Sequence, residues 1–91
     1  MSKNLFNNVK LMFFHAPWCG QCKAYTPTVH KAVQETGVNL VDIDANTEMT
    51  LCEQNGIMNL PVVILTDGEK TERIDGMVSL EILLDKIKSF K

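Results

Sequence analysis

The sequence has 91 residues, a formal net charge of −2 and 45% hydrophobic residues, enough for one small folded unit with an apolar core. A slightly acidic chain excludes nucleic acid and anionic membranes as main partners, and no apolar run approaches the ~20 residues of a membrane span. Three cysteines are too few for the disulfide framework of a secreted scaffold, so we expect a single monomeric, cytoplasmic domain over residues 1–91, with residues 1–8 as a short N-terminal extension.

The first half of the chain predicts a strand, a helix and a second strand. Residues 9–14 are nearly all apolar, which is typical of a central strand covered on both faces. The helix is predicted over 20–36, with Gly37 as its C-terminal stop and Pro27 as an interior proline that should kink it. The second strand, over 38–43, completes a βαβ unit whose strands are parallel.

A short helix and a third strand are predicted next. Asn46 or Thr47 is suited to cap the helix, and Gly56 is suited to end it. The apolar run over 61–65 then predicts a buried strand.

The C-terminal part predicts a hairpin and a final helix. The pair Asp67-Gly68 is a strong turn signal, so a fourth strand is expected over 70–75. Ser79 is positioned to cap the last helix, whose apolar stripe consists of Leu80, Leu83, Leu84, Ile87 and Phe90. The order β-α-β-α-β-β-α indicates an α/β fold with a mixed four-stranded sheet and helices on both faces.

Two cysteines stand three positions apart between the first strand and the first helix, at Cys19 and Cys22. A Cys-x-x-Cys pair at such a junction is typical of a redox site. Backbone N–H groups at a helix N-terminus favour an anion and lower the pKa of a thiol held there. Cys19 precedes the first turn, so we predict that it is the attacking thiolate. Cys22 lies one turn further in, should be more buried, and is predicted to be the resolving thiol.

The same two cysteines could also form half of a zinc site, which needs four ligands. The other candidate ligands are Cys52, His15 and His30. His30 lies eight residues beyond Cys22 on the predicted helix, about 12 Å along its axis, which is too far to share a metal. We therefore predict a redox pair and no metal.

Five other side chains each have more than one interpretation. Trp18 is expected to be half exposed beside the disulfide rather than in the core. Cys52 is expected to pack as a small buried hydrophobe, with a regulatory or dimer-forming thiol as the alternative. His15 is either satisfied by backbone at the strand end or a proton acceptor in the reaction. Met58 and Met77 either fill the core or border a substrate groove.

From Val9 to its end, the chain resembles the thioredoxin family. The run Trp18-Cys19-Gly20-Gln21-Cys22-Lys23 matches the active-site motif of that family, except at its fourth position. Pro27 matches the proline that kinks the helix, Leu60-Pro61 the cis-proline, and Gly76 the late glycine. The resemblance implies the thioredoxin fold, protein disulfide oxidoreductase activity without a bound cofactor, and a substrate-binding surface that comprises Trp18, Gly20, Gln21, Leu60, Pro61 and Gly76.

Three departures from the family pattern bear on function. Gln21 stands where most members have proline, and this position helps to set the reduction potential. Phe13 replaces a buried aspartate six residues before the first cysteine, and Leu40 replaces its lysine partner. The chain also lacks room for the first strand and helix of typical thioredoxins, so its length is closer to that of a glutaredoxin, although its motif is not.

The implied partners are disulfide-bearing protein substrates and an electron donor, either a thioredoxin reductase or a low-molecular-weight thiol. One alternative is a glutathione-coupled, glutaredoxin-like reductase, for which the nearest basic residues are Arg73 and Lys70. The other is a redox-inactive binding module with the thioredoxin fold. The intact pair Cys19 and Cys22, with Trp18 beside it, argues against the second alternative.

Overall fold

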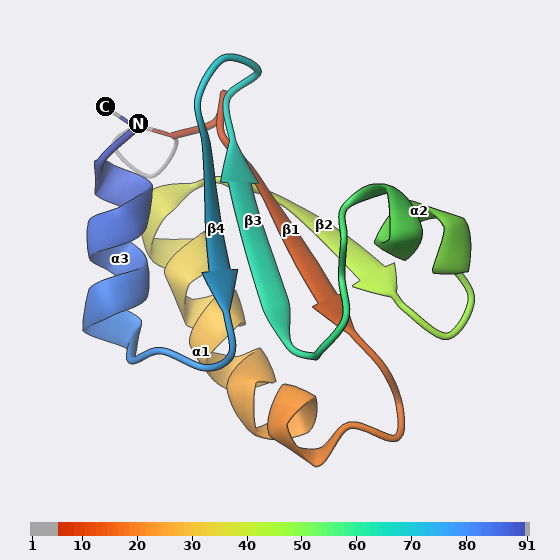
Figure 1. Ribbon diagram of the computed structural model, residues 1–91. Coiled ribbons are helices and arrows are strands. Elements are labelled where there is room, and N and C mark those ends of the chain that lie inside the picture. The colour runs from red at the N-terminus through yellow and green to blue at the C-terminus, as the bar shows by residue number, and fades with distance from the viewer. Residues whose placement is uncertain (1–5, 91) are drawn as a thin grey trace.

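A computed structural model describes residues 6–90 of the chain (Figure 1). It contains the expected elements in the expected order: β1 (Lys10–His15), α1 (Gly20–Thr36), β2 (Asn39–Asp44), α2 (Met49–Gln54), β3 (Val62–Thr66), β4 (Thr71–Asp75) and α3 (Leu80–Lys88). The four strands form one sheet in the order β2-β1-β3-β4. β1 is parallel to β2 and antiparallel to β3, and β4 is antiparallel to β3. The predicted mixed α/β fold is therefore confirmed.

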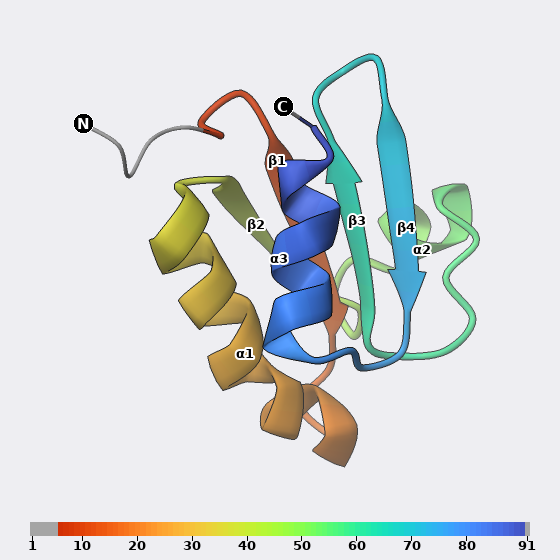
Figure 2. The ribbon, with the colours of Figure 1, turned by 90° about the vertical axis from the view of Figure 1, so that its left-hand side faces the viewer.

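The helices cover both faces of the sheet, as expected. α1 and α3 lie on one face and α2 lies on the other (Figures 1 and 2). Because successive strand residues point to opposite faces, Leu11 and Phe13 of β1 join the larger core with α1 and α3, whereas Phe14 packs toward α2. Burial on both faces explains why the middle of β1, Leu11 to Phe14, is entirely apolar in sequence.

Two predicted helix boundaries are confirmed by their capping geometry. Gly37 adopts a left-handed conformation (φ 79°) and donates its N–H to the carbonyl of Val33 at 2.9 Å, which ends α1. Ser79 accepts a hydrogen bond from the N–H of Ile82 through its hydroxyl oxygen at 3.2 Å, which starts α3. Pro27 lies inside α1 as predicted.

The predicted cap of α2 is wrong. Glu48 occupies the cap position and makes no side-chain cap hydrogen bond. The expected caps belong instead to the turn that follows β2. There the Asp44 carboxylate accepts from the N–H of Asn46 at 2.8 Å, and the Thr47 hydroxyl donates to the Asp44 carbonyl at 3.2 Å. The turn after β2 thus takes up both residues before the helix begins.

The N-terminal segment contributes to the core, which the sequence analysis missed. Phe6 is buried against the larger core and donates its N–H to the Thr36 carbonyl at 3.3 Å. Part of the predicted extension over 1–8 is thus packed, and residues 1–5 lie outside the described residues. Over residues 6–90, no helix combines the length and the apolar character needed to cross a membrane.

Candidate active site

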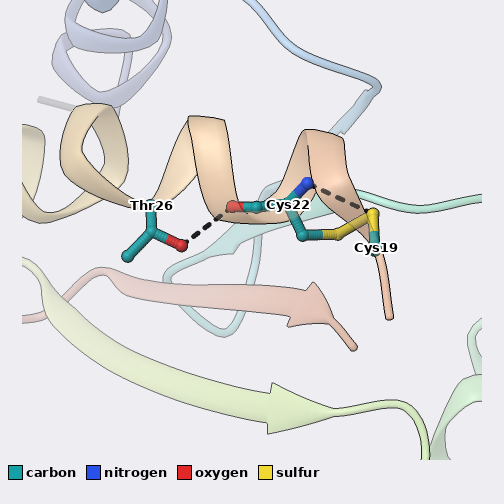
Figure 3. Close-up of a disulfide and its surroundings, with 3 residues drawn as sticks. All are labelled: Cys19, Cys22 and Thr26. Carbon is teal, nitrogen blue, oxygen red and sulfur yellow. Dashed lines mark hydrogen bonds between the residues drawn. A yellow bond between two sulfur atoms is a disulfide. The ribbon is translucent and has the colours of Figure 1, made fainter. Parts of the chain in front are cut away.

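The two cysteines of the motif form a disulfide at the first turn of α1 (Figure 3). Their Cα atoms are 5.2 Å apart. Cys19 is the N-cap residue, in an extended conformation, and its Sγ accepts a hydrogen bond from the backbone N–H of Cys22 at 3.1 Å. The first turn of α1 thus directs an otherwise unpaired helix N–H group at the Cys19 sulfur, as the sequence predicted.

Burial distinguishes the two sulfurs in the predicted sense. Cys22 is 2% exposed and Cys19 is 9% exposed, and both pack with Ala16 and Leu60. Cys22 is therefore the inner residue of the pair. Cys19 is less open than expected, because Leu60 packs against this small cluster from the loop before β3.

The loop before β3 and the loop after β4 meet beside the disulfide. The peptide bond between Leu60 and Pro61 is cis, which confirms the prediction for this bond. Gly76 donates its N–H to the Pro61 carbonyl at 2.9 Å and has φ 82°, a conformation that favours glycine. The structure thus brings Leu60, Pro61 and Gly76 together, although they come from two different loops.

A cavity of about 460 Å³ opens next to Cys19. Trp18 is 70% exposed and Met58 is 88% exposed, so large apolar side chains border it in contact with solvent. Trp18 is thus more exposed than the predicted half. The residues that line the cavity are Trp18, Cys19, Ala45, Met49, Cys52, Glu53, Ile57, Met58, Asn59 and Leu60. It is a mostly apolar recess that reaches from Cys19 to α2.

Some predicted site residues lie outside this recess. Gly20 and Gln21 are exposed on the first turn of α1, and neither lines the cavity. Met58 lines the cavity, which agrees with the hypothesis that it borders a groove rather than fills the core. Met77 is exposed but does not line the cavity.

One side of the cavity is formed by α2, which was not predicted from the sequence. Met49, Cys52 and Glu53 of α2 all line the cavity. Their spacing of i, i+3 and i+4 places them on one face of a helix, which was the available sequence signal.

Cys52 is buried, as predicted. Burial, together with the negative charge of Glu48, raises the pKa of the Cys52 thiol above its ordinary value. A raised pKa disfavours the thiolate, which is the reactive form of Cys52.

Arg73 holds the segment that leads to Leu60. Its Nη1 donates to the Asn55 carbonyl at 2.7 Å and its Nη2 to the Gly56 carbonyl at 3.0 Å, while its Nε donates to Asp75 at 2.9 Å. β4 is thereby tied to the C-terminal end of α2. The guanidinium is engaged by the protein itself rather than held ready for a glutathione carboxylate.

Lys70, the other basic candidate for glutathione, lies far from the disulfide. Its ammonium donates to the Ser89 carbonyl at 2.9 Å. The β3–β4 hairpin that carries it is at the opposite end of the sheet from the start of α1 (Figure 1).

Phe13, which stands where the thioredoxin family has a buried aspartate, lies in an apolar environment in the structure. Phe13 is 1% exposed, and Leu40 packs against the same core.

His15, at the end of β1, forms a short contact between its Nε2 and Asp42 Oδ1 at 2.5 Å. The interpretation of His15 as satisfied by backbone is therefore wrong, because its partner is a carboxylate. Within residues 6–90, no three His, Cys, Asp or Glu side chains are grouped so that they could hold a metal ion.

Comparisons with known proteins agree with this geometry. The thioredoxin family model matches residues 3–89. The thioredoxin of Bacillus subtilis is 34% identical over 82 residues, which cover 87% of this chain and 79% of that protein. A protein disulfide-isomerase of Humicola insolens is 37% identical over 65 residues, which cover 68% of this chain but only 13% of that protein. A solved mutant thioredoxin from Halobacterium salinarum is 32% identical, superposes with a TM-score of 0.85, and is matched over 92% of this chain and 75% of its own.

Proposed function

The chain belongs to the thioredoxin family of thiol–disulfide oxidoreductases, and we propose that it reduces disulfides of other proteins, with Cys19 as nucleophile and Cys22 as resolving thiol. The observation that carries the proposal is the hydrogen bond from the Cys22 N–H to the Cys19 Sγ, beside an open apolar recess. A helix N–H aimed at a sulfur favours its thiolate, which is the reactive form.

The proposed reaction has two exchange steps. In the first, the Cys19 thiolate attacks one sulfur of a substrate disulfide. A Cys19–substrate bond forms, the substrate S–S bond breaks, and the departing thiolate takes up a proton. In the second, Cys22 loses its proton and attacks the Cys19 Sγ, which releases the second substrate thiolate. Two electrons have then passed to the substrate, and the protein holds the Cys19–Cys22 disulfide seen here.

The substrate surface in this proposal consists of Trp18, the cis peptide at Leu60-Pro61 and the adjacent Gly76, and Gly20 and Gln21 flank the sulfurs on α1. An extended substrate segment would pair with the backbone at Leu60 as an added strand. Its apolar side chains would enter the recess beside Cys19, where burial of apolar surface contributes to binding.

The electron donor and the cellular setting are also part of the proposal. We expect a flavin-dependent thioredoxin reductase or a low-molecular-weight thiol to reduce the disulfide again, with no bound cofactor. A monomer in the reducing cytoplasm fits a chain with so few cysteines.

Reduction of insulin disulfides with dithiothreitol as donor tests the proposal. The native chain should accelerate the reaction, Cys19→Ser should abolish the acceleration, and Cys52→Ser, the matched control, should retain it. Cys22→Ser should accumulate a mixed disulfide with the substrate through Cys19. No acceleration by the native chain would favour the redox-inactive binding module instead. Turnover with glutathione alone, but not with a reductase, would favour the glutaredoxin-like alternative.

A further inference from the structure

The resolving step requires a group that removes the proton of Cys22, and the core around this residue offers few. Cys22 is 2% exposed, so bulk water has little access to its sulfur. The buried cluster that holds Cys22 consists of Ala16, Cys19 and Cys22, with Leu60 packed against it, and neither Ala16 nor Leu60 can accept a proton. The larger core cluster, which includes Phe13, has the Tyr25 hydroxyl as its one polar side-chain group. A buried thiol without an acceptor would stay protonated, because burial disfavours the charged form.

His15 lies on the face of the sheet that α1 covers. Phe13 and His15 alternate with Phe14 along β1 and therefore share a face. The Phe13 ring lies 5.0 Å from the His15 ring and 6.0 Å from the Tyr25 ring of α1, measured between centroids. The sheet face that carries His15 is therefore in contact with α1 through this row of rings.

His15 and Cys22 lie toward the same end of that contact. The loop over 16–19 links the end of β1 directly to the start of α1, so the two elements run in opposite directions. From Phe13, His15 is two strand residues onward, or about 6.6 Å. From Tyr25, Cys22 is three helix residues back, or about 4.5 Å. Both steps lead toward the disulfide, which places His15 at the level of Cys22.

Asp42 fixes which ring nitrogen of His15 is available. It lies on β2, where its register partner is Phe13, and its Oδ1 is in contact with the His15 Nε2. An ionised carboxylate only accepts hydrogen bonds, so Nε2 carries the proton and the neutral ring has its acceptor at Nδ1. A histidine oriented by a carboxylate in this way is the usual arrangement for activating a nearby nucleophile.

We propose that His15 is the proton acceptor for Cys22 in the resolving step and that Asp42 is its positioning residue. This inference rests on the proposed function. The His15 Nδ1 takes the proton from the Cys22 Sγ, directly or through one water. The Cys22 thiolate then attacks the Cys19 Sγ, the Cys19–Cys22 bond forms, and the substrate sulfur leaves with the electron pair of the broken bond. The imidazolium afterwards returns its proton to solvent, which reaches the His15 side chain (26% exposed).

Other titratable groups around His15 do not take this role. Asp44 is its register partner on β2, but its carboxylate accepts a hydrogen bond from the N–H of Asn46 at 2.8 Å and so belongs to the turn after β2. Lys23 lies in the first turn of α1 and is exposed, and burial raises the pKa of Tyr25. β3, the other strand beside β1, has the sequence VVILT and carries no titratable side chain.

The test separates the two exchange steps in the Cys52→Ser background. Reduced protein mixed with substoichiometric 5,5′-dithiobis(2-nitrobenzoate) releases one thionitrobenzoate when Cys19 attacks and a second when Cys22 resolves. His15→Gln should slow the second release about a hundredfold near pH 7, the low end of the range for a positioned base, because the site is partly exposed. The first release should be unchanged. His30→Gln, which removes the exposed histidine of α1, is the matched control and should change neither.

The pH profile distinguishes a proton acceptor from a structural role. The ratio of the native to the variant second-phase rate should be largest near neutral pH. It should shrink toward about pH 5, where imidazole is protonated, and toward high pH, where the thiol ionises unaided. Asp42→Asn should give a smaller loss with the same shape. A loss by one constant factor at every pH, or no loss at all, would overturn the proposal.

The NMR signals of the His15 ring test the proposal without any catalytic turnover. In Cys19→Ser, the ring proton signals of His15 should move when Cys22 is alkylated, because the proposal places the imidazole within reach of the Cys22 sulfur. Signals that stay in place would refute the inference even if the variants above failed to fold. Conversely, a protein inactive on insulin that still shows the His15-dependent second phase would contradict the proposed function alone.

Discussion

Arg73 is the residue whose replacement should most clearly separate substrate binding from chemistry. Its guanidinium donates to the carbonyls of Asn55 and Gly56 at 2.7 and 3.0 Å and so holds the segment that carries Met58 and Leu60. Glutamine is shorter and uncharged and cannot present the same fork of donors. In Arg73→Gln this segment should lose its tie to β4, and the recess beside Cys19 should lose its defined edge.

The hydrogen bonds of Arg73 set the size of the expected effect. An intramolecular hydrogen bond contributes about 0.5–1.5 kcal/mol net, and the 37% exposure of the Arg73 side chain favours the lower half of that range. The two carbonyl bonds then contribute about 1–2 kcal/mol together, and the exposed ion pair with Asp75 adds at most about 1 kcal/mol. A total loss of about 1–3 kcal/mol should lower Tm by about 4–24 °C in a domain of this length.

Thermal unfolding and steady-state kinetics together test this reasoning. Asp75→Asn is the matched control, because it removes the ion pair and keeps both carbonyl bonds, so its Tm should fall by less. Arg73→Gln should raise KM for insulin more than it lowers kcat, and it should leave the reaction with a small aromatic disulfide unchanged. This prediction is contradicted if Arg73→Gln is no less stable than Asp75→Asn and binds insulin as well as the native chain does. The hydrogen bonds from Arg73 to Asn55 and Gly56 would then have no role in shaping the site.

Two further predictions concern titrating groups. Because burial and the Glu48 charge raise the pKa of Cys52, iodoacetamide at neutral pH should alkylate the reduced protein at Cys19 well before Cys52, and Glu48→Gln should speed the reaction at Cys52; equal rates at the two thiols would contradict this. The backbone N–H groups of Lys70 and Glu69 lower the pKa of Asp67 below its ordinary value, so its ionised form stabilises the hairpin at neutral pH and that contribution is lost as the pH falls below about 4. Asp67→Ala should therefore be less stable than the native chain in urea unfolding at pH 7, with the difference shrinking in acid, and a difference independent of pH would count against the carboxylate.

Much of the fold was predictable because its signals are local. The left-handed Gly37 and the cap at Ser79 each depend on a residue and its immediate neighbours, whereas the cis bond before Pro61 was expected from the resemblance to the thioredoxin family. The prediction failed at α2, where Asn46 and Thr47 are good caps in isolation. Asp44 uses both in the preceding turn, and a helix start cannot be chosen from propensity when a competing turn satisfies the same groups.

The candidate site shows the same difference between local signals and contacts of residues far apart in the sequence. The sequence by itself determined the reactive pair, because three residues of a helical turn bring Cys19 and Cys22 together wherever that helix lies. Only the tertiary structure decided what surrounds them: the α2 residues that line the recess, the hydrogen bond from Arg73 to the Asn55 carbonyl, and the pairing of His15 with Asp42. These partners are 18 and 27 residues apart in the last two cases. Contacts at such separations follow from strand order and register, which depend on how the whole chain buries its apolar faces rather than on any short pattern.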